Sequence, residues 1–186
     1  INASPLFVGK PAFRYTEHEY AKFANEKAGR TAVVLAAAND GMLHAFDRAS
    51  GDELWAFVPS FVIPKLHKLA DENFANAHEY FVDGSPQMGD IWDGDSWRTI
   101  VVGGLNKGGR GYYALDVTDP GDPELLWEFS DPNLGYTFGN PIITKRKNGT
   151  WVVVFASGYD NNTEGDGNGR LYVLDAQTGT PVDDFP

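Results

Sequence analysis

One stretch of the sequence occurs three times, and it limits the possible folds more than any other feature. Each copy is a glycine-rich turn, a short apolar strand that ends in aspartate, a second polar turn and another strand. The copies read NDGMLHAFDRASGDELWAFVP, KGGRGYYALDVTDPGDPELLWEF and GDGNGRLYVLDAQTGTPVDDF, and their marker aspartates are Asp47, Asp116 and Asp175. A strand-and-turn unit that recurs in this way predicts a repeat architecture, for which the natural candidate is a β-propeller.

The sequence therefore predicts an all-β chain, a partial β-propeller of about three blades with short helical insertions. All 186 residues are assigned to this one domain. The predicted blades cover residues 31–59, 79–130 and 139–186, and the predicted helical insertions cover residues 17–28 and 61–73. Because propellers typically close with about four to eight blades, we expect the chain to be a piece of a larger propeller.

Local patterns refine this prediction at several places. Residues 1–14 contain two prolines and a glycine and predict an irregular lead-in. Thr16 and Glu19 have the spacing of a capping box at the start of the first helix. In the second insertion, Pro64 suits the first turn of a helix. The near-continuous apolar run at residues 31–38 predicts a strand that is buried on both faces.

The third copy of the repeat departs from the other two. Trp55 and Trp127 lie in the last strand of the first two copies, where they are interpreted as residues that pack one blade on another. Alignment of the turns places Asp183 at the corresponding position of the third copy. The last strand of that blade is predicted at residues 181–185, with a different or incomplete packing.

The three marker aspartates allow two interpretations. Aligned carboxylates could bind a metal or take part in catalysis. Alternatively, each carboxylate could accept hydrogen bonds from the backbone N–H groups of its own turn, as Asp does in many polar turns. The motifs DRASG and DAQTG, in which the aspartate precedes a short polar turn that ends in glycine, favour the second interpretation.

The best candidate for a functional site is the loop DNNTEGDGNG at residues 160–169. Calcium takes about six to eight oxygen ligands and tolerates flexible loops. The candidate ligands alternate along this loop: Asp160, Asn162, Glu164, Asp166 and Asn168. The alternative is a plain solvated hairpin loop, and the match to an EF-hand loop fails at its twelfth position, Leu171. A second acidic stretch, Asp90 to Asp95, is interpreted as a hairpin turn.

Composition argues against several classes of function. The formal net charge of −11 disfavours nucleic acid and anionic lipid surfaces as partners. The chain has no cysteine, and its four histidines show no ligand spacing, so neither a disulfide nor a zinc site is expected. No apolar run is long enough for a transmembrane helix. No catalytic constellation and no cofactor-binding fingerprint is found.

Longer motifs carry a resemblance to known families. The units LHAFDRASGDELW and LYVLDAQTG are similar to the repeats of quinoprotein (PQQ) dehydrogenase propellers. A closer resemblance is to the C-terminal β-propeller of the PilY/PilC family of type IV pilus biogenesis factors and tip adhesins. The motifs that carry it are NDGMLHAFD, HEYFVDGSP, GGLNKGGRGYYALDVTDP, GNPIITK and FASGYDNN, which cover most of the chain from Thr31 onward.

The PilY/PilC resemblance implies a non-enzymatic module that supports pilus biogenesis, twitching motility and adhesion. It further implies a location in the bacterial cell envelope, in the periplasm or at the outer-membrane surface and pilus tip, with pilins, minor pilins and a host-surface receptor as partners. Family members bind Ca²⁺ through a short Asp/Asn-rich loop, which residues 160–168 could provide. The alternatives are a fragment of a quinoprotein-type dehydrogenase and a scaffold for outer-membrane assembly.

Overall fold

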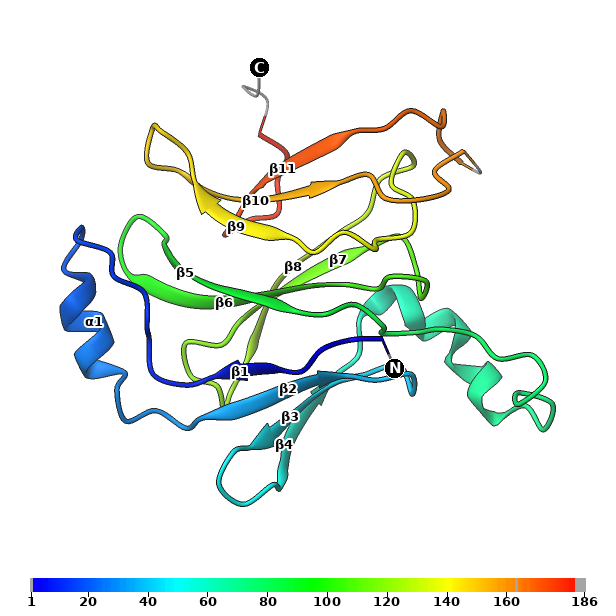
Figure 1. Cartoon of the computed structure of the whole chain (residues 1–186), viewed down its shortest axis with the longest axis horizontal. Helices are drawn as coiled ribbons and strands as arrows, with labels where there is room; N and C mark the ends of the chain where they lie inside the picture. The colour runs from blue at the N-terminus through cyan, green and yellow to red at the C-terminus, as the bar shows by residue number, and fades with distance from the viewer. Residues whose placement is uncertain (1, 163, 183–186) are drawn as a thin grey trace.

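Three antiparallel sheets are stacked face to face in the computed structural model, which describes residues 2–162 and 164–182 (Figure 1). Strands pair with their neighbours in chain order within every sheet. The first sheet contains β1 (Leu6–Val8), β2 (Val33–Ala37), β3 (Leu43–Asp47) and β4 (Glu53–Phe57). The second contains β5 (Gln87–Trp92), β6 (Trp97–Gly104), β7 (Tyr112–Asp116) and β8 (Glu124–Phe129), and the third contains β9 (Ile142–Lys145), β10 (Trp151–Ala156) and β11 (Leu171–Asp175).

The end of the third sheet is described only in part. Pro181 forms an isolated antiparallel bridge with Leu174 of β11, which begins a fourth strand position in this sheet. The remainder of the strand predicted at residues 181–185, including Asp183, lies outside the described residues. The comparison of Asp183 with the tryptophans of the other copies therefore stays a prediction.

The sequence predicts an irregular lead-in at residues 1–14, but part of this segment is a strand. Leu6–Val8 forms β1, which pairs with β2 in the register Leu6 to Leu35 and Val8 to Val33. Val8 is fully buried. Three residues are too few to display an alternating pattern, so the pairing partner rather than the local sequence defines this strand.

Two predictions about the helical insertions are wrong in detail. Helix α1 (Tyr20–Glu26) is preceded by Glu19, whose φ of 51° is left-handed and which makes no side-chain cap, so the capping box does not form. The second insertion is helical, as predicted, and forms the 3₁₀-helix η1 (Ser60–Ala70), but Pro64 is not in its first turn. Pro64 lies inside it and has no backbone N–H to donate, which weakens an α-helical hydrogen-bond ladder at this point.

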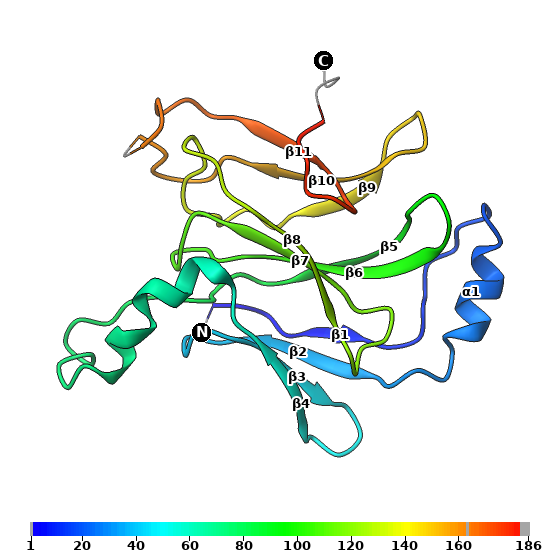
Figure 2. The same cartoon turned by 180° about the vertical axis from the view of Figure 1, so that it is seen from behind.

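The second sheet is the centre of the molecule, because both of its faces are buried. Along β6, Ile100 and Val102 face the third sheet, whereas Val101 between them faces the first. This alternation is the period of two expected of strands. The outer sheets have one described neighbour each, and β2 is accordingly buried on alternate residues rather than on both faces as predicted. Both views of the chain show the same stack (Figure 2).

The marker aspartates shape the turns that follow their strands. The Oδ1 atom of Asp47 accepts hydrogen bonds from the N–H groups of Ala49 and Ser50, at 2.7 and 2.8 Å. Asp175 does the same in the third sheet, from Gln177 and Thr178 at 3.0 and 2.9 Å. The interpretation that these carboxylates lock their own turns is confirmed.

The two tryptophans connect consecutive sheets, which confirms their interpretation as packing residues. Trp127 on β8 donates its indole N–H to the carbonyl oxygen of Ala176 in the turn of the third sheet, at 3.0 Å. Trp55 on β4 donates to the carbonyl oxygen of Pro120, in the equivalent turn of the second sheet, at 2.8 Å. The first sheet is thereby bonded to the aspartate turn of the second, and the second to that of the third.

A matched pair of glycines tests this docking. Gly179 has a φ of 70°, and a Cβ atom there would lie 2.6 Å from Cγ of Trp127, whereas Gly51 has a φ of 81° with nothing within 4 Å. We expect Gly51→Ala to cost about 1–2 kcal/mol of unfolding free energy from backbone strain alone. Gly179→Ala should cost about 1–3 kcal/mol more because of the clash. Chemical denaturation measures the unfolding free energy of both variants. Equal losses of unfolding free energy would show that the contact with the indole of Trp127 does not contribute to stability.

Candidate functional site

The two ends of the stacked sheets carry different kinds of connection. The turns that follow β3, β7 and β11 lie at one end together with α1, which we call the turn end (Figure 1). The connections between β2 and β3, β6 and β7, and β10 and β11 lie at the other, together with η1, which we call the loop end. The predicted calcium loop belongs to the loop end. Loops held by a rigid scaffold are common places for binding sites.

Asn161 anchors the predicted calcium loop to the rest of the fold. Its side chain is 7% exposed and donates from Nδ2 to the carbonyl oxygens of Asn133, at 2.9 Å, and Asn168, at 2.7 Å. Gly165 lies so close to the segment before β9 that a Cβ atom would be 2.7 Å from the carbonyl oxygen of Pro132. The spacing argument missed Asn161, because this residue falls between the alternating oxygen-bearing positions.

The structure brings only some of the predicted ligands together. Asp166 forms a bidentate pair with Arg170, with Nη1 to Oδ1 at 2.6 Å and Nη2 to Oδ2 at 2.8 Å, and Asn168 also donates to Oδ2 of Asp166, at 2.8 Å. The hydrogen bonds from Arg170 hold the pKa of Asp166 well below its usual range. Asp160 instead has Oδ2 3.9 Å from Nη2 of Arg110.

The other two predicted ligands, Asn162 and Glu164, are exposed. Within residues 2–162 and 164–182, no group of three or more His, Cys, Asp or Glu side chains is arranged to hold a metal ion. The described geometry is therefore a loop whose central carboxylate is bonded to an arginine. A cation that used Asp166 would have to compete with that guanidinium.

The second acidic stretch separates into a buried group and a hairpin turn. Asp90 is fully buried and accepts hydrogen bonds from Tyr20 Oη, at 2.5 Å, and Thr99 Oγ1, at 2.6 Å. Burial raises the pKa of Asp90. Asp93 closes the β5–β6 hairpin, accepting from the N–H groups of Asp95 and Ser96. The hairpin interpretation is confirmed for Asp93 and Asp95, whereas Asp90 lies within β5.

An arginine ties this hairpin to one of the marker aspartates. Arg98 donates to Asp93 and, through Nη1, to Oδ2 of Asp116, at 2.8 Å. Burial alone would raise the pKa of Asp93, but hydrogen bonds from Ser96 and Arg98 outweigh it and lower the pKa to about 2. The carboxylates of Asp93 and Asp116 therefore have a structural role as hydrogen-bond partners of Arg98.

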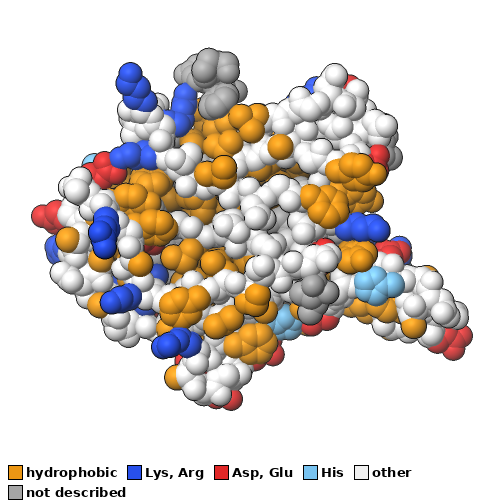
Figure 3. Space-filling view, in the orientation of Figure 1, with side chains coloured by type: hydrophobic (Ala, Val, Ile, Leu, Met, Phe, Trp, Pro, Cys, Tyr) orange, Lys and Arg blue, Asp and Glu red, His pale blue; other side chains and the backbone are white. Residues whose placement is uncertain are grey.

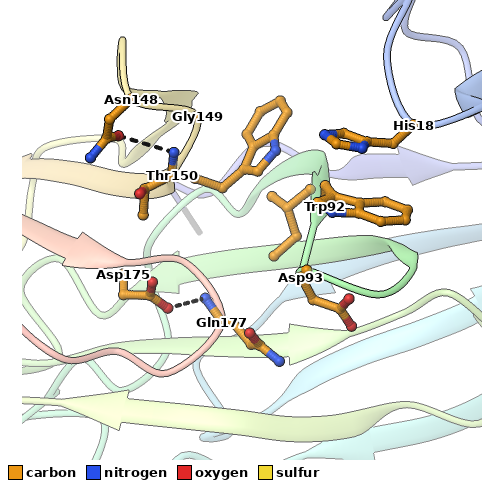
Figure 4. Close-up of a pocket in the computed structure, with 11 residues that line it drawn as sticks. His18, Trp92, Asp93, Asn148, Gly149, Thr150, Asp175 and Gln177 are labelled. Atoms are coloured by element: carbon orange, nitrogen blue, oxygen red, sulfur yellow. Dashed lines mark hydrogen bonds between the residues drawn. The ribbon is translucent and has the colours of Figure 1, made fainter.

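A shallow hollow of about 370 Å³ lies at the turn end (Figure 4). The ring of His18 stacks on Trp92 on one side, with the ring centroids 4.4 Å apart. Asn148 and Asp175 lie on the other side, and each accepts a hydrogen bond from a backbone N–H of its own turn. Asp93 is bonded to Arg98 as described above. The acids that line this hollow are therefore already engaged.

His44 on β3 is held between two carboxylates. Its Nδ1 lies 2.7 Å from Oε1 of Glu53, and its Nε2 lies 2.9 Å from Oδ2 of Asp40. Burial of the ring lowers its pKa, but the hydrogen bonds with Glu53 and Asp40 outweigh burial, and the net pKa is raised. Since both ring nitrogens are occupied, His44 is a structural tie rather than a free acid or base.

The stacked antiparallel sheets of three or four strands, their locked aspartate turns and their tryptophan contacts are features of β-propeller blades. The predicted fold, a partial β-propeller, is confirmed by comparison with known proteins. The family model described as the PilY1 beta-propeller domain matches residues 1–182. The chain belongs to this family, as its sequence motifs predicted.

Relatives of known identity are much longer than this chain. It is 41% identical over 190 residues to the type IV pilus biogenesis factor PilY1 of Pseudomonas aeruginosa strain PAO1, a match that covers 96% of this chain and 16% of the relative. It is 42% identical to a PilY1 homolog of Xylella fastidiosa, which covers 96% and 15%. The chain thus spans about one-sixth of the length of these relatives.

A crystal structure supports the same relationship. The C-terminal domain of Pseudomonas aeruginosa PilY1 is similar to this chain with a TM-score of 0.77 and 37% sequence identity. The match covers 94% of this chain and 35% of that domain.

Among the described residues, no helix has both the length and the apolar character needed to cross a membrane.

The His44 tie predicts a specific dependence of stability on pH. The folded protein binds the His44 proton more tightly than the unfolded chain does. The stabilisation is therefore complete below the unfolded pKa of about 6.5 and is lost as the pH rises through the higher folded-state pKa. We expect the unfolding free energy of the native chain to fall above about pH 6.5 more steeply than that of His44→Gln. Parallel curves from chemical denaturation at a series of pH values would contradict the assignment.

Proposed function

We propose that this chain is a non-enzymatic module of a type IV pilus biogenesis factor. The observation that carries the proposal is the family match, which extends over residues 1–182, together with about 40% identity to PilY1 proteins across nearly the whole chain. Such a long match covers the blades, their turns and the helical insertion between the first two sheets. It is not limited to the short repeat that many propellers share.

The roles of the titratable side chains support a structural rather than a catalytic module. Asp47 and Asp175 lock turns, and Asp93 closes a hairpin. Asp90 is buried with two hydroxyl partners, and His44 is bonded at both ring nitrogens. In each case the geometry accounts for the residue without any reaction.

The proposed partners and location rest on what the relatives are named for. We propose that the chain acts within a larger protein of the bacterial cell envelope, exposed at the outer surface or the pilus tip. Its partners there would be pilins and minor pilins of the type IV pilus, and a host-surface receptor in adhesion. The relatives are named as pilus biogenesis factors, which supports pilus components as the first partners to test.

The test is made in a bacterium whose full-length protein contains this chain. Deletion should reduce surface pili and twitching motility, and the wild-type gene should restore them. Trp127→Ala should fail to restore them, because loss of a large buried aromatic residue costs about 3–5 kcal/mol. The control Leu125→Ala changes a side chain of the same strand that is 53% exposed and should restore both. Normal piliation after deletion would refute the proposal.

We further propose that the loop at residues 160–168 binds calcium. The loop offers carboxylate oxygens from Asp160, Glu164 and Asp166, and calcium prefers such ligands in flexible loops. In the described geometry Arg170 occupies Asp166. Calcium would therefore take over the charge compensation that the guanidinium now supplies, and the loop would rearrange around the anchored Asn161.

A thermal melt in calcium and in chelator tests this proposal on the chain itself. A ligand at about 100 times its dissociation constant adds roughly 2.7 kcal/mol, which shifts the melting temperature by several degrees. The shift should disappear in Asp160→Ala with Asp166→Ala. The control Asp52→Ala with Asp122→Ala removes the same charge from exposed turns and should keep it. Absence of a shift in the wild-type chain would make the loop a plain turn.

A further inference from the structure

A second hollow, of about 390 Å³, opens at the loop end beside the predicted calcium loop. The helix η1, the segment before β5, the β6–β7 turn and the segment before β9 each contribute to its walls. Its lining includes three cationic side chains and two tyrosine rings: Lys65, Lys107, Arg110, Tyr80 and Tyr136. Its volume falls in the range of small-molecule sites, which are about 300–1,000 Å³.

Lys65 builds the wall of this hollow. Its Nζ donates to the carbonyl oxygens of Tyr80, at 2.7 Å, and Gly108, at 2.5 Å, and lies 4.8 Å from the ring centroid of Phe81. Burial lowers the pKa of this amine. Lys65 therefore fastens η1 to two neighbouring segments and sets the shape of the hollow, while its charge adds to the positive potential inside it.

Lys107 and Arg110 present their charges on the same hollow. Nζ of Lys107 lies 5.1 Å from the ring centroid of Tyr80, and the guanidinium carbon of Arg110 lies 5.6 Å from that of Tyr136. The tyrosine rings hold these cations by their faces. Among the described residues, Lys107 has no carboxylate within 4.0 Å, and the nearest one to Arg110 is that of Asp160, at 3.9 Å.

Among the described residues, the carboxylate of Asp160 is the one that lies within 4.0 Å of these cations, at 3.9 Å from Arg110. Glu79, which also lines the hollow, is paired with Lys68 outside it. Three cations thus share one recess in a chain whose formal net charge is −11. Figure 3 shows Lys or Arg side chains at this end of the molecule, with Asp or Glu and His side chains next to them and hydrophobic surface beside them. Such a concentration of positive charge attracts anions and focuses their approach.

We propose that this hollow, the basic pocket, binds an oxyanion of the carboxylate or phosphate kind between Lys107 and Arg110. Arg110 donates one N–H to the carbonyl oxygen of Asp160, at 3.0 Å, and its other N–H groups make no hydrogen bond to the described residues. A planar guanidinium matches carboxylate and phosphate oxygens, and Lys107 adds a point charge. Tyr80 and Tyr136 supply apolar walls for the body of the ligand.

Isothermal titration of the whole chain with three probes tests the proposal: inorganic phosphate, citrate and a short peptide rich in Asp and Glu. At least one probe should bind saturably, and more weakly at high salt. Its affinity should fall about tenfold or more in Lys107→Gln and in Arg110→Gln, because each removes a charged hydrogen bond. Arg110→Lys keeps the charge without the planar fork and should lie between Arg110→Gln and the wild type.

The matched control is Lys147→Gln, which removes one exposed positive charge from the β9–β10 turn at the other end of the sheets. It should leave the affinity unchanged, and thermal melts should show that all variants fold. Tighter binding of the peptide would assign the anion to a protein partner, and tighter binding of citrate or phosphate to a free small molecule. Lack of saturable binding by every probe, or an equal loss in Lys147→Gln, would overturn the proposal.

Discussion

The hydrogen bond from a tryptophan indole to a turn of the next sheet is the contact on which the rest of the structure depends. Trp127 can reach the carbonyl oxygen of Ala176 because Asp175 draws the N–H groups of Gln177 and Thr178 inward and fixes the turn. A buried indole N–H without a partner would be costly, so the locked turn and the tryptophan need each other. The aspartate of one sheet and the tryptophan of the previous one therefore act as a pair.

This pairing gives the stack a direction. Each of the first two sheets offers a tryptophan from its last strand to the turn that follows the third strand of the next sheet, as Trp55 does to Pro120. The contact is head-to-tail, so it can be repeated along a series of sheets without changing its geometry. The second sheet takes part in both roles, and it alone has both faces buried among the described residues. The same arrangement accounts for the wide clash-free space at Gly51 and the close approach at Gly179.

Features that are local and periodic could be predicted from the sequence, whereas features set by a distant partner could not. The strands and the locked turns of Asp47 and Asp175 each follow from a few neighbouring residues, and the packing role of Trp127 was indicated by the recurrence of tryptophan at Trp55. By contrast, β1 exists because β2 pairs with it. The backbone of Glu19 has a left-handed conformation, and the predicted capping box does not form. The candidate calcium loop illustrates the same limit. The sequence shows the spacing of the oxygen-bearing side chains, but the ion pair between Arg170 and Asp166 depends on the conformation of the loop.

The two ends of the sheets differ in what their charges are used for. At the turn end, Asp93, Arg98 and Asp116 satisfy one another, and the same end docks the sheets together. The loop end lacks the tryptophan contacts, and polar contacts such as the bridge between Asn106 and Thr137 link its connections instead. Loops held on such a scaffold commonly carry binding groups. Arg110 lies there between the basic pocket and Asp160. A cation in the loop would compete with this guanidinium for Asp160, and an anion in the pocket would draw on the same group. Binding at either place must then change affinity at the other, and by the same factor in both directions.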